Sequence, residues 1–215
     1  MNPNASSAGR PTGIRILGVD PAAAGPTGFA VIEVTGRDCR VLRYGALKVS
    51  SKRQKASQGA VLHDVHELLR GLIREFQPHV MAVESVFTAL NMRTALRLAE
   101  VRGVVLLAAE QAGVTVRSYS PREIKACVAG YGHADKRQMQ RMVRAQLDMK
   151  ELPEPFDAAD ALAVALCHLQ TDRLEQRFGV DSKDLAQPAR RSPSNPLPGP
   201  PRVTISRGAS IQSER

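Results

Sequence analysis

The sequence lacks the long apolar segments of a membrane protein. No stretch approaches the roughly eighteen consecutive apolar residues that a transmembrane helix requires. The first residues also lack the basic stretch and the apolar core of a secretory signal peptide. We therefore expect a cytoplasmic protein that has no membrane partner.

Cysteine is also scarce. The three cysteines, Cys39, Cys127 and Cys167, are odd in number and do not have the spacing of a metal site. We interpret them as reduced, mostly buried thiols, which agrees with a cytoplasmic location.

Negative charge is in short supply relative to positive charge. Lys and Arg total 30 against 21 Asp and Glu, which gives a formal net charge of +9 and a sequence pI of about 10.0. Because lysines and arginines that neutralise phosphates release counterions, this balance favours a nucleic-acid partner. A basic protein kept soluble by its charge, or one bound to an anionic membrane, would have the same composition.

The hydrophobic pattern predicts one α/β domain. The 215 residues, 43% of them hydrophobic, suffice for one well-buried domain with extra segments. Short apolar runs predict strands at about residues 14–20, 27–34, 39–48, 79–84 and 114–119. Helical spacing predicts helices at about residues 56–77, 92–112, 121–129, 134–147 and 156–171. Short turns make the first three strands antiparallel, and a helical crossover makes the last two parallel.

The two ends of the chain have a different composition. Residues 1–13 are small, polar and proline-containing, and residues 188–215 combine six prolines with five arginines. Such segments cannot bury enough apolar surface to offset their chain entropy. We expect a disordered leader at 1–13, a folded domain at 14–171 and a Pro- and Arg-rich, largely disordered tail at 172–215.

Four isolated carboxylates mark a candidate site. Asp20 and Glu84 each end an apolar run that reads as a buried strand, at the edge where open α/β sheets bind ligands. Asp157 and Asp160 lie three residues apart at the start of the last predicted helix and share one face, although a helix cap and a first-turn acid are the ordinary alternatives. Clustered carboxylates repel each other unless divalent ions such as Mg²⁺ or Mn²⁺ bind them, and a pair of such ions can promote phosphodiester hydrolysis.

The order of elements describes a ribonuclease H-like fold, a five-stranded mixed sheet with three antiparallel strands, then parallel ones, flanked by helices. Five motifs match one family at the right separations: GVDP at 18–21, AVESVF at 82–87, RGV at 102–104, YSPREIKACVAGYGHADK at 119–136 and DAADALAVA at 157–165. On these motifs the chain resembles the RuvC family of Holliday-junction resolvases over about residues 14–171.

The resemblance implies a structure-specific endodeoxyribonuclease that acts in homologous recombination and DNA repair. Asp20, Glu84, Asp157 and Asp160 would be catalytic and would bind two Mg²⁺ ions per subunit, which Mn²⁺ could replace. One ion would activate a water for in-line attack on the phosphate, and the other would stabilise the departing 3′ oxygen. The resemblance further implies a homodimer that cuts four-way junction DNA symmetrically, with a RuvAB-type branch-migration complex as a partner.

The resemblance also assigns DNA contacts. Phe87 would be a wedge that stacks on bases near the crossover, with a core phenylalanine as the alternative. Lys125 and Lys136 match lysines that contact phosphates, with solvated surface lysines as the alternative. Helical position alone adds four arginines to this basic surface: Arg93, Arg97, Arg137 and Arg141.

The loop after Asp20 departs from the family pattern. Residues 22–28 read AAAGPTG, which lacks the family's early glycine and small hydroxyl residue and adds one position. This turn could instead hold nucleotide phosphates, as in actin-like ATPases, but those proteins repeat the domain and this chain has one copy. Two further alternatives are a nuclease of the same fold that acts on structured RNA, like the RuvX-like proteins, and a non-catalytic junction-binding module.

Overall fold

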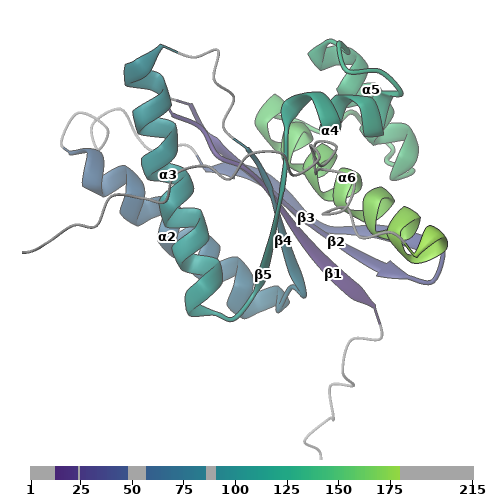
Figure 1. Cartoon of the computed structure of the whole chain (residues 1–215), viewed down its shortest axis with the longest axis horizontal. Helices are drawn as coiled ribbons and strands as arrows, with labels where there is room; N and C mark the ends of the chain where they lie inside the picture. Colours follow the sequence, from purple (N-terminus) through teal and green to yellow (C-terminus); the bar gives the residue numbers. More distant parts are fainter. Residues whose placement is uncertain (1–12, 24, 48–56, 86–90, 180–215) are drawn as a thin grey trace, which may run out of the picture. The chain divides into compact units, whose positions relative to one another are not determined.

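The computed structural model describes residues 13–23, 25–47, 57–85 and 91–179. These residues form a five-stranded sheet in the order β3-β2-β1-β4-β5, with helices on both faces (Figure 1). The strands are β1 (Ile14–Asp20), β2 (Thr27–Thr35), β3 (Asp38–Leu47), β4 (Val80–Glu84) and β5 (Thr115–Tyr119). The helices are α2 (Gln58–Phe76), α3 (Met92–Gln111), α4 (Pro121–Ala129), α5 (Lys136–Gln146) and α6 (Phe156–Phe178). The predicted α/β fold class and element order are confirmed.

The strand directions follow from the connections. β1, β2 and β3 are joined by short turns and pair antiparallel, and Gly36 supplies the left-handed conformation of the second turn with a φ of 61°. β4 returns beside β1 in parallel, and β5 pairs in parallel with β4. The carboxyl ends of β1, β4 and β5 therefore meet at one edge of the sheet.

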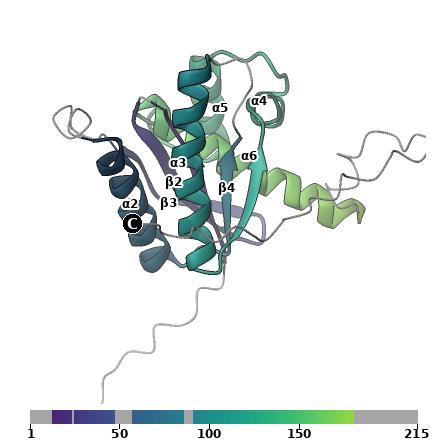
Figure 2. The ribbon, with the colours of Figure 1, turned by 60° about the vertical axis from the view of Figure 1, so that its left-hand side comes forward.

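Each face of the sheet has its own core. α2 and α3 cover one face, and α4, α5 and α6 cover the other (Figure 2). Alternation along β1 explains the division, because Leu17 and Val19 point into the first core while Ile16 points into the second. α2 supplies Val65, Leu69, Leu72 and Ile73 at helical spacing to the first core.

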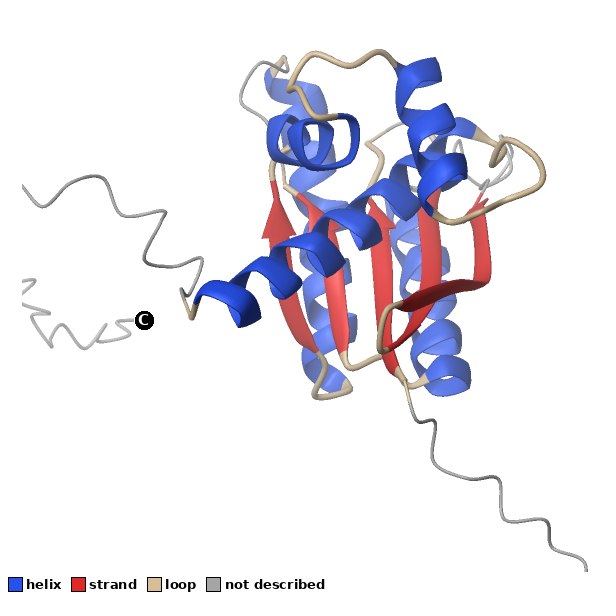
Figure 3. Ribbon diagram, turned by 90° about the vertical axis from the view of Figure 1, so that its right-hand side faces the viewer, coloured by secondary structure: helices blue, strands red, loops and turns tan. Residues whose placement is uncertain are grey.

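α6 lies across the sheet and is the longest helix in the described part of the chain (Figure 3). The prediction that it ends near residue 171 is wrong, because it continues to Phe178. The apolar periodicity of the sequence fades after residue 170, and polar contacts fix the rest of the helix instead. The Arg173 guanidinium donates to the carbonyl oxygens of Gly36 and Arg37 at 3.3 and 3.2 Å. Gly179 then ends the helix in a left-handed conformation with a φ of 63°.

Two sequence predictions concern the rest of the chain. Residues 1–12 and 180–215 lie outside the described residues, so the disordered leader and the disordered tail stay predictions. Among the described residues, no helix is both long and apolar enough to cross a bilayer.

Candidate active site

Asp20 and Glu84 lie side by side at the carboxyl edge of the sheet. Asp20 is the last residue of β1 and Glu84 is the last residue of β4. These strands are parallel neighbours with Val19 opposite Val83, so the register places the two acids next to each other. The sequence prediction that both acids end strands at one edge is confirmed.

Two glycines bring α6 close to this edge. A Cβ atom on Gly18 would overlap the carbonyl oxygen of Ala161, and a Cβ atom on Gly28 would overlap the carbonyl oxygen of Asp157. The backbone of α6 therefore packs directly on β1 and β2, which only glycine permits at these two positions. The close approach places the first turns of α6, with Asp157 and Asp160, against the end of β1.

Three of the four predicted acids line one cavity of about 300 Å³, namely Asp20, Glu84 and Asp160. Both predicted lysines, Lys125 on α4 and Lys136 on α5, line it as well. Sequence reasoning did not identify the apolar part of the lining, which consists of Pro121, Ile124, Met139 and Ala163. These residues carry no chemical signal of their own and become recognisable only once α4, α5 and α6 are packed.

The sequence fixes where α4 and α5 begin. Ser120 caps α4 by accepting from the backbone N–H of Glu123 at 3.2 Å, and the Glu123 carboxylate accepts from the Ser120 N–H at 2.6 Å. Asp135 and Gln138 form the same reciprocal pair at the start of α5. Capping boxes of this kind satisfy the first free N–H groups of a helix. As a result, Lys136 is held as the first residue of α5, at the cavity.

The site disfavours the charge of its own acids. Burial, followed by the charges of the neighbouring acids, raises the pKa of Asp20 well above its usual value of 3.8. Burial and the charge of Asp160 raise the pKa of Glu84 to about 7, against the opposing charges of Lys125 and Lys136. Burial also raises the pKa of Asp160, although Lys136 opposes this shift. The two lysines therefore compensate the acids only in part, and a further cation would be stabilised here.

The donor set fits a divalent metal ion, because carboxylate oxygens are the ligands that Mg²⁺ and Mn²⁺ prefer. Within the described ranges, however, no three His, Cys, Asp or Glu side chains lie in an arrangement that could hold a metal ion. The Lys136 ammonium lies 3.6 Å from Asp160 Oδ2, where it takes the place that a cation would have. The roles of the four acids as metal ligands therefore stay a prediction.

The remaining predicted residues lie around or beyond this cavity. Asp157 does not line it, but its charge raises the pKa of Asp20 and of Asp160. It is not a helix cap, because Pro155 occupies that position. The four predicted arginines are exposed on α3 and α5 and do not line the cavity: Arg93, Arg97, Arg137 and Arg141. Phe87 lies outside the described residues, so its role as a wedge stays a prediction.

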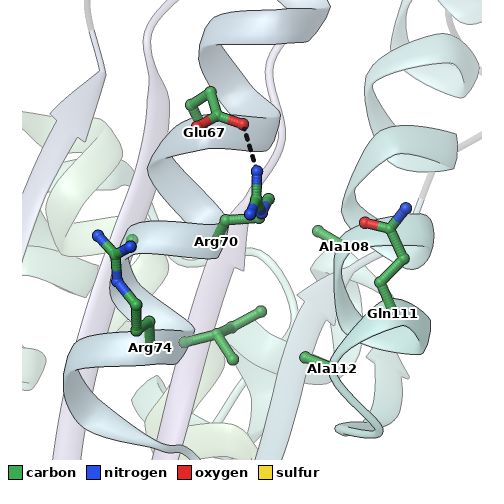
Figure 4. A pocket seen from close by; sticks show the side chains of 8 residues that line it. Glu67, Arg70, Arg74, Ala108, Gln111 and Ala112 are labelled. Carbon is green, nitrogen blue, oxygen red and sulfur yellow. Dashed lines mark hydrogen bonds and ion pairs between the residues drawn. The ribbon is translucent and has the colours of Figure 1, made fainter.

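Two other hollows do not gather acids. One, of about 300 Å³, lies between α2 and α3, and Figure 4 shows its acid, Glu67, paired with Arg70 at 3.0 Å. The other, of about 540 Å³, lies at the opposite end of the sheet, where its lining includes Asp172 beside Arg117 and Arg173. Neither has the carboxylate cluster that nuclease chemistry requires.

The alternative of a nucleotide-phosphate turn after Asp20 is not supported. Thr27 is only 3% exposed, and it pairs with Leu47 as the first residue of β2. Gly28 lies against the backbone of α6 at Asp157. Neither residue can therefore face a bound phosphate.

Comparisons with known proteins agree on one family. The family model described as "Crossover junction endodeoxyribonuclease RuvC" matches residues 16–168. A protein of that name from Halothermothrix orenii is 42% identical over 165 residues, which cover 77% of this chain and 98% of that protein. Another from Chloroflexus aggregans is 45% identical over 167 residues, which cover 78% of this chain and 99% of that protein. The solved structure "T. thermophilus RuvC in complex with Holliday junction substrate" is similar with a TM-score of 0.69 and 33% identity, over 75% of this chain and 96% of that one. The chain belongs to the RuvC family of crossover junction endodeoxyribonucleases.

Proposed function

We propose that this chain is a Mg²⁺-dependent endonuclease that resolves four-way DNA junctions in homologous recombination and DNA repair. The family is one of metal-dependent nucleases, which implies a divalent ion. The observation that carries the proposal is the pairing of Asp20 with Glu84 at the ends of adjacent parallel strands, in a cavity that also contains Asp160, Lys125 and Lys136.

Each polar group of the cavity has a role in this proposal. Asp20, Glu84 and Asp160, with Asp157, would hold two Mg²⁺ ions, and Mn²⁺ could replace them. When bound, such ions lower the pKa of a water nucleophile and stabilise the departing oxygen. Lys125 and Lys136 provide positive charge at the mouth of the cavity, where they orient the phosphate backbone.

We propose that the active form is a homodimer, because symmetric cleavage of a four-way junction needs two sites related by a two-fold axis. α3 provides a surface for it. Met92, Leu96 and Leu107 are 75%, 59% and 51% exposed and lie on one face of the helix with the exposed Ala99 and Gly103. A contiguous exposed apolar stripe is typical of a protein interface. A RuvAB-type partner rests on the family resemblance alone.

The two functional alternatives are less well supported. The relatives are named as endodeoxyribonucleases, which favours DNA over structured RNA. A non-catalytic junction-binding module would not need a half-buried acid cluster facing the DNA, because uncompensated carboxylates repel phosphates.

One cleavage assay separates these functions. The purified chain is incubated with a four-way junction, a duplex, single-stranded DNA and structured RNA, each with Mg²⁺ and with EDTA. We expect paired, Mg²⁺-dependent cuts in opposite strands of the junction and little cleavage of the other substrates. Preferred cleavage of RNA would contradict the proposal, and so would junction binding without any cleavage.

The dimer is tested by a charge placed on the apolar stripe. Leu96→Glu should convert a dimer into a monomer in analytical ultracentrifugation and should uncouple the paired cuts. Leu174→Glu is the matched control, because Leu174 is 55% exposed on α6, away from α3. A monomeric wild-type chain that still makes paired cuts would contradict the proposed dimer.

A further inference from the structure

Lys136 and Phe156 meet where two helices begin. Lys136 is the first residue of α5 and Phe156 is the first residue of α6. The Lys136 ammonium lies 5.9 Å from the centroid of the Phe156 ring and 3.6 Å from Asp160 Oδ2. One ammonium group therefore contacts an aromatic face and a candidate metal ligand at the same time.

Burial explains only part of the choice of phenylalanine at position 156. Phe156 is 41% exposed, whereas the residues that follow Asp160 on α6 are buried without interruption from Ala161 to Leu169. The exposed part of the ring gains nothing from the hydrophobic effect. Its contact with a cation is the interaction that this position offers.

Lys136 needs such a contact to occupy one place. Its side chain is 69% exposed and has many rotamers available, so a single distant ion pair does not fix it. Phe156 and Asp160 are four residues apart on α6 and share one face of that helix, so the ring gives the ammonium a second contact beside the carboxylate. From there Lys136 can neutralise Asp160 in the free protein or turn to a phosphate of bound DNA.

We propose that Phe156 is a positioning residue for Lys136, whose ammonium it holds at the mouth of the acid cavity through its ring face. The inference rests on the proposed function, because the phosphate that Lys136 would bind belongs to the DNA substrate. Phe156 itself is not assigned a contact with DNA.

The contact between the two side chains can be measured without DNA. Aromatic ring currents shift the signals of groups above the ring face to lower frequency. The chain has seven lysines, so ¹³C labelling at Cε gives a simple NMR spectrum, and Lys136→Ala assigns the signal of interest. We expect an upfield-shifted Hε signal for Lys136 that returns to the ordinary position in Phe156→Leu and persists in Phe156→Tyr. An ordinary Lys136 signal in the wild-type protein would overturn the proposal.

A double-mutant cycle tests the consequence for DNA. Junction affinity in EDTA and the rate of junction cleavage in Mg²⁺ are measured for Phe156→Leu, Lys136→Ala and the double variant. An exposed cation–π contact corresponds to about a twofold to fivefold effect, so Phe156→Leu should weaken binding by that factor. It should have no effect in the Lys136→Ala background, and Phe156→Tyr should restore wild-type values. Phe178→Leu is the matched control, because the Arg177 guanidinium lies 5.5 Å from the centroid of the Phe178 ring at the far end of α6.

The outcomes are distinct. A Phe156→Leu effect that persists in the Lys136→Ala background would overturn the proposal, because the ring would then contact DNA directly. If the wild-type chain does not cleave junctions, the proposed function fails, but the NMR experiment still decides whether Phe156 holds Lys136.

Discussion

A single acid on β2 and the cluster of acids at the sheet edge have opposite electrostatic environments in this molecule. Glu33 on β2 lies between two arginines: Arg15 Nε is 2.8 Å from Oε1, and Arg40 Nη2 is 2.7 Å from Oε2. Hydrogen bonds from Arg15 and then from Arg40 lower the pKa of Glu33 below its usual 4.5. At the carboxyl edge of the same sheet, burial and mutual repulsion raise the pKa values of Asp20 and Glu84.

The number of cations decides the difference. One carboxylate with two arginines is a satisfied structural ion pair that links β1, β2 and β3. Four carboxylates with two lysines form a cluster whose negative charge is compensated only in part, and we expect this cluster to favour added cations. We expect the first arrangement to contribute to stability and the second to contribute to function.

The largest expected effect comes from removing an acid of the cluster. Asp20→Asn, Glu84→Gln or Asp160→Asn should lower the rate of junction cleavage by at least about 10³-fold, or about 4 kcal/mol of transition-state stabilisation. Each change removes a repelling charge, so the unfolding temperature in EDTA and the junction affinity should be unchanged or higher. Single-turnover cleavage and thermal unfolding measure both effects.

Asp172→Asn on the same helix, outside the acid cavity, is the control and should cleave normally. If the cluster variants cleave at the wild-type rate, the acids are not catalytic. If they unfold at lower temperature instead, the cluster is structural, as Glu33 is.

The next effect concerns the glycines that bring α6 to the acids. Gly18→Ala places a methyl group on the carbonyl oxygen of Ala161, and we expect a loss of about 1–3 kcal/mol of stability with slower cleavage. Gly71→Ala is the control, because its Cβ would meet no atom within 4 Å. In the interior of α2 it should stabilise by about 0.5–1 kcal/mol. Equal stability of the two variants would show that α6 can shift away from the sheet without cost.

The sequence was sufficient for the parts of the fold that local patterns determine. Short apolar runs and helical spacing predicted most elements to within a few residues, and the ends of the first and fourth predicted strands placed Asp20 and Glu84 at one edge of the sheet. The end of α6 was missed, because Arg173 holds it through carbonyl groups that are distant in sequence.

The orientation of side chains in the site could not be predicted from the sequence. Whether Lys136 lies over Phe156 and near Asp160 depends on how α5 packs on α6. The tight contact at Gly28 likewise depends on the path of α6, although the glycine itself was visible as part of a turn. Motifs therefore identified the candidate residues, and packing determined how their side chains meet.

The contribution of Glu33 to the stability of the fold should depend on pH. Because the folded pKa of Glu33 lies below its usual 4.5, its stabilising contribution is complete above pH 4.5 and is lost as the pH falls through the folded value. Glu33→Gln should therefore lower the unfolding temperature at pH 7, by less than Gly18→Ala does, and should flatten the acid limb of the stability profile. Glu75→Gln is the control, because the Arg43–Glu75 pair is about half exposed and should contribute almost nothing. An unchanged acid limb in Glu33→Gln would show that its ion pairs do not stabilise the fold.

The smallest expected effect separates a lysine that serves DNA from one that only neutralises acids. Lys125 lines the acid cavity and lowers the pKa of Glu84 by its charge, so it could act as Arg15 and Arg40 do at Glu33. If it also binds a phosphate, Lys125→Ala should weaken junction affinity and reduce the slope of log affinity against log salt by about one. Lys150→Ala, at an exposed position outside the cavity, should leave the slope unchanged. If Lys125→Ala keeps the wild-type slope of log affinity against log salt and unfolds at a lower temperature, Lys125 is a structural counter-ion. The acid cluster would then resemble the Glu33 site more closely than the structure indicates.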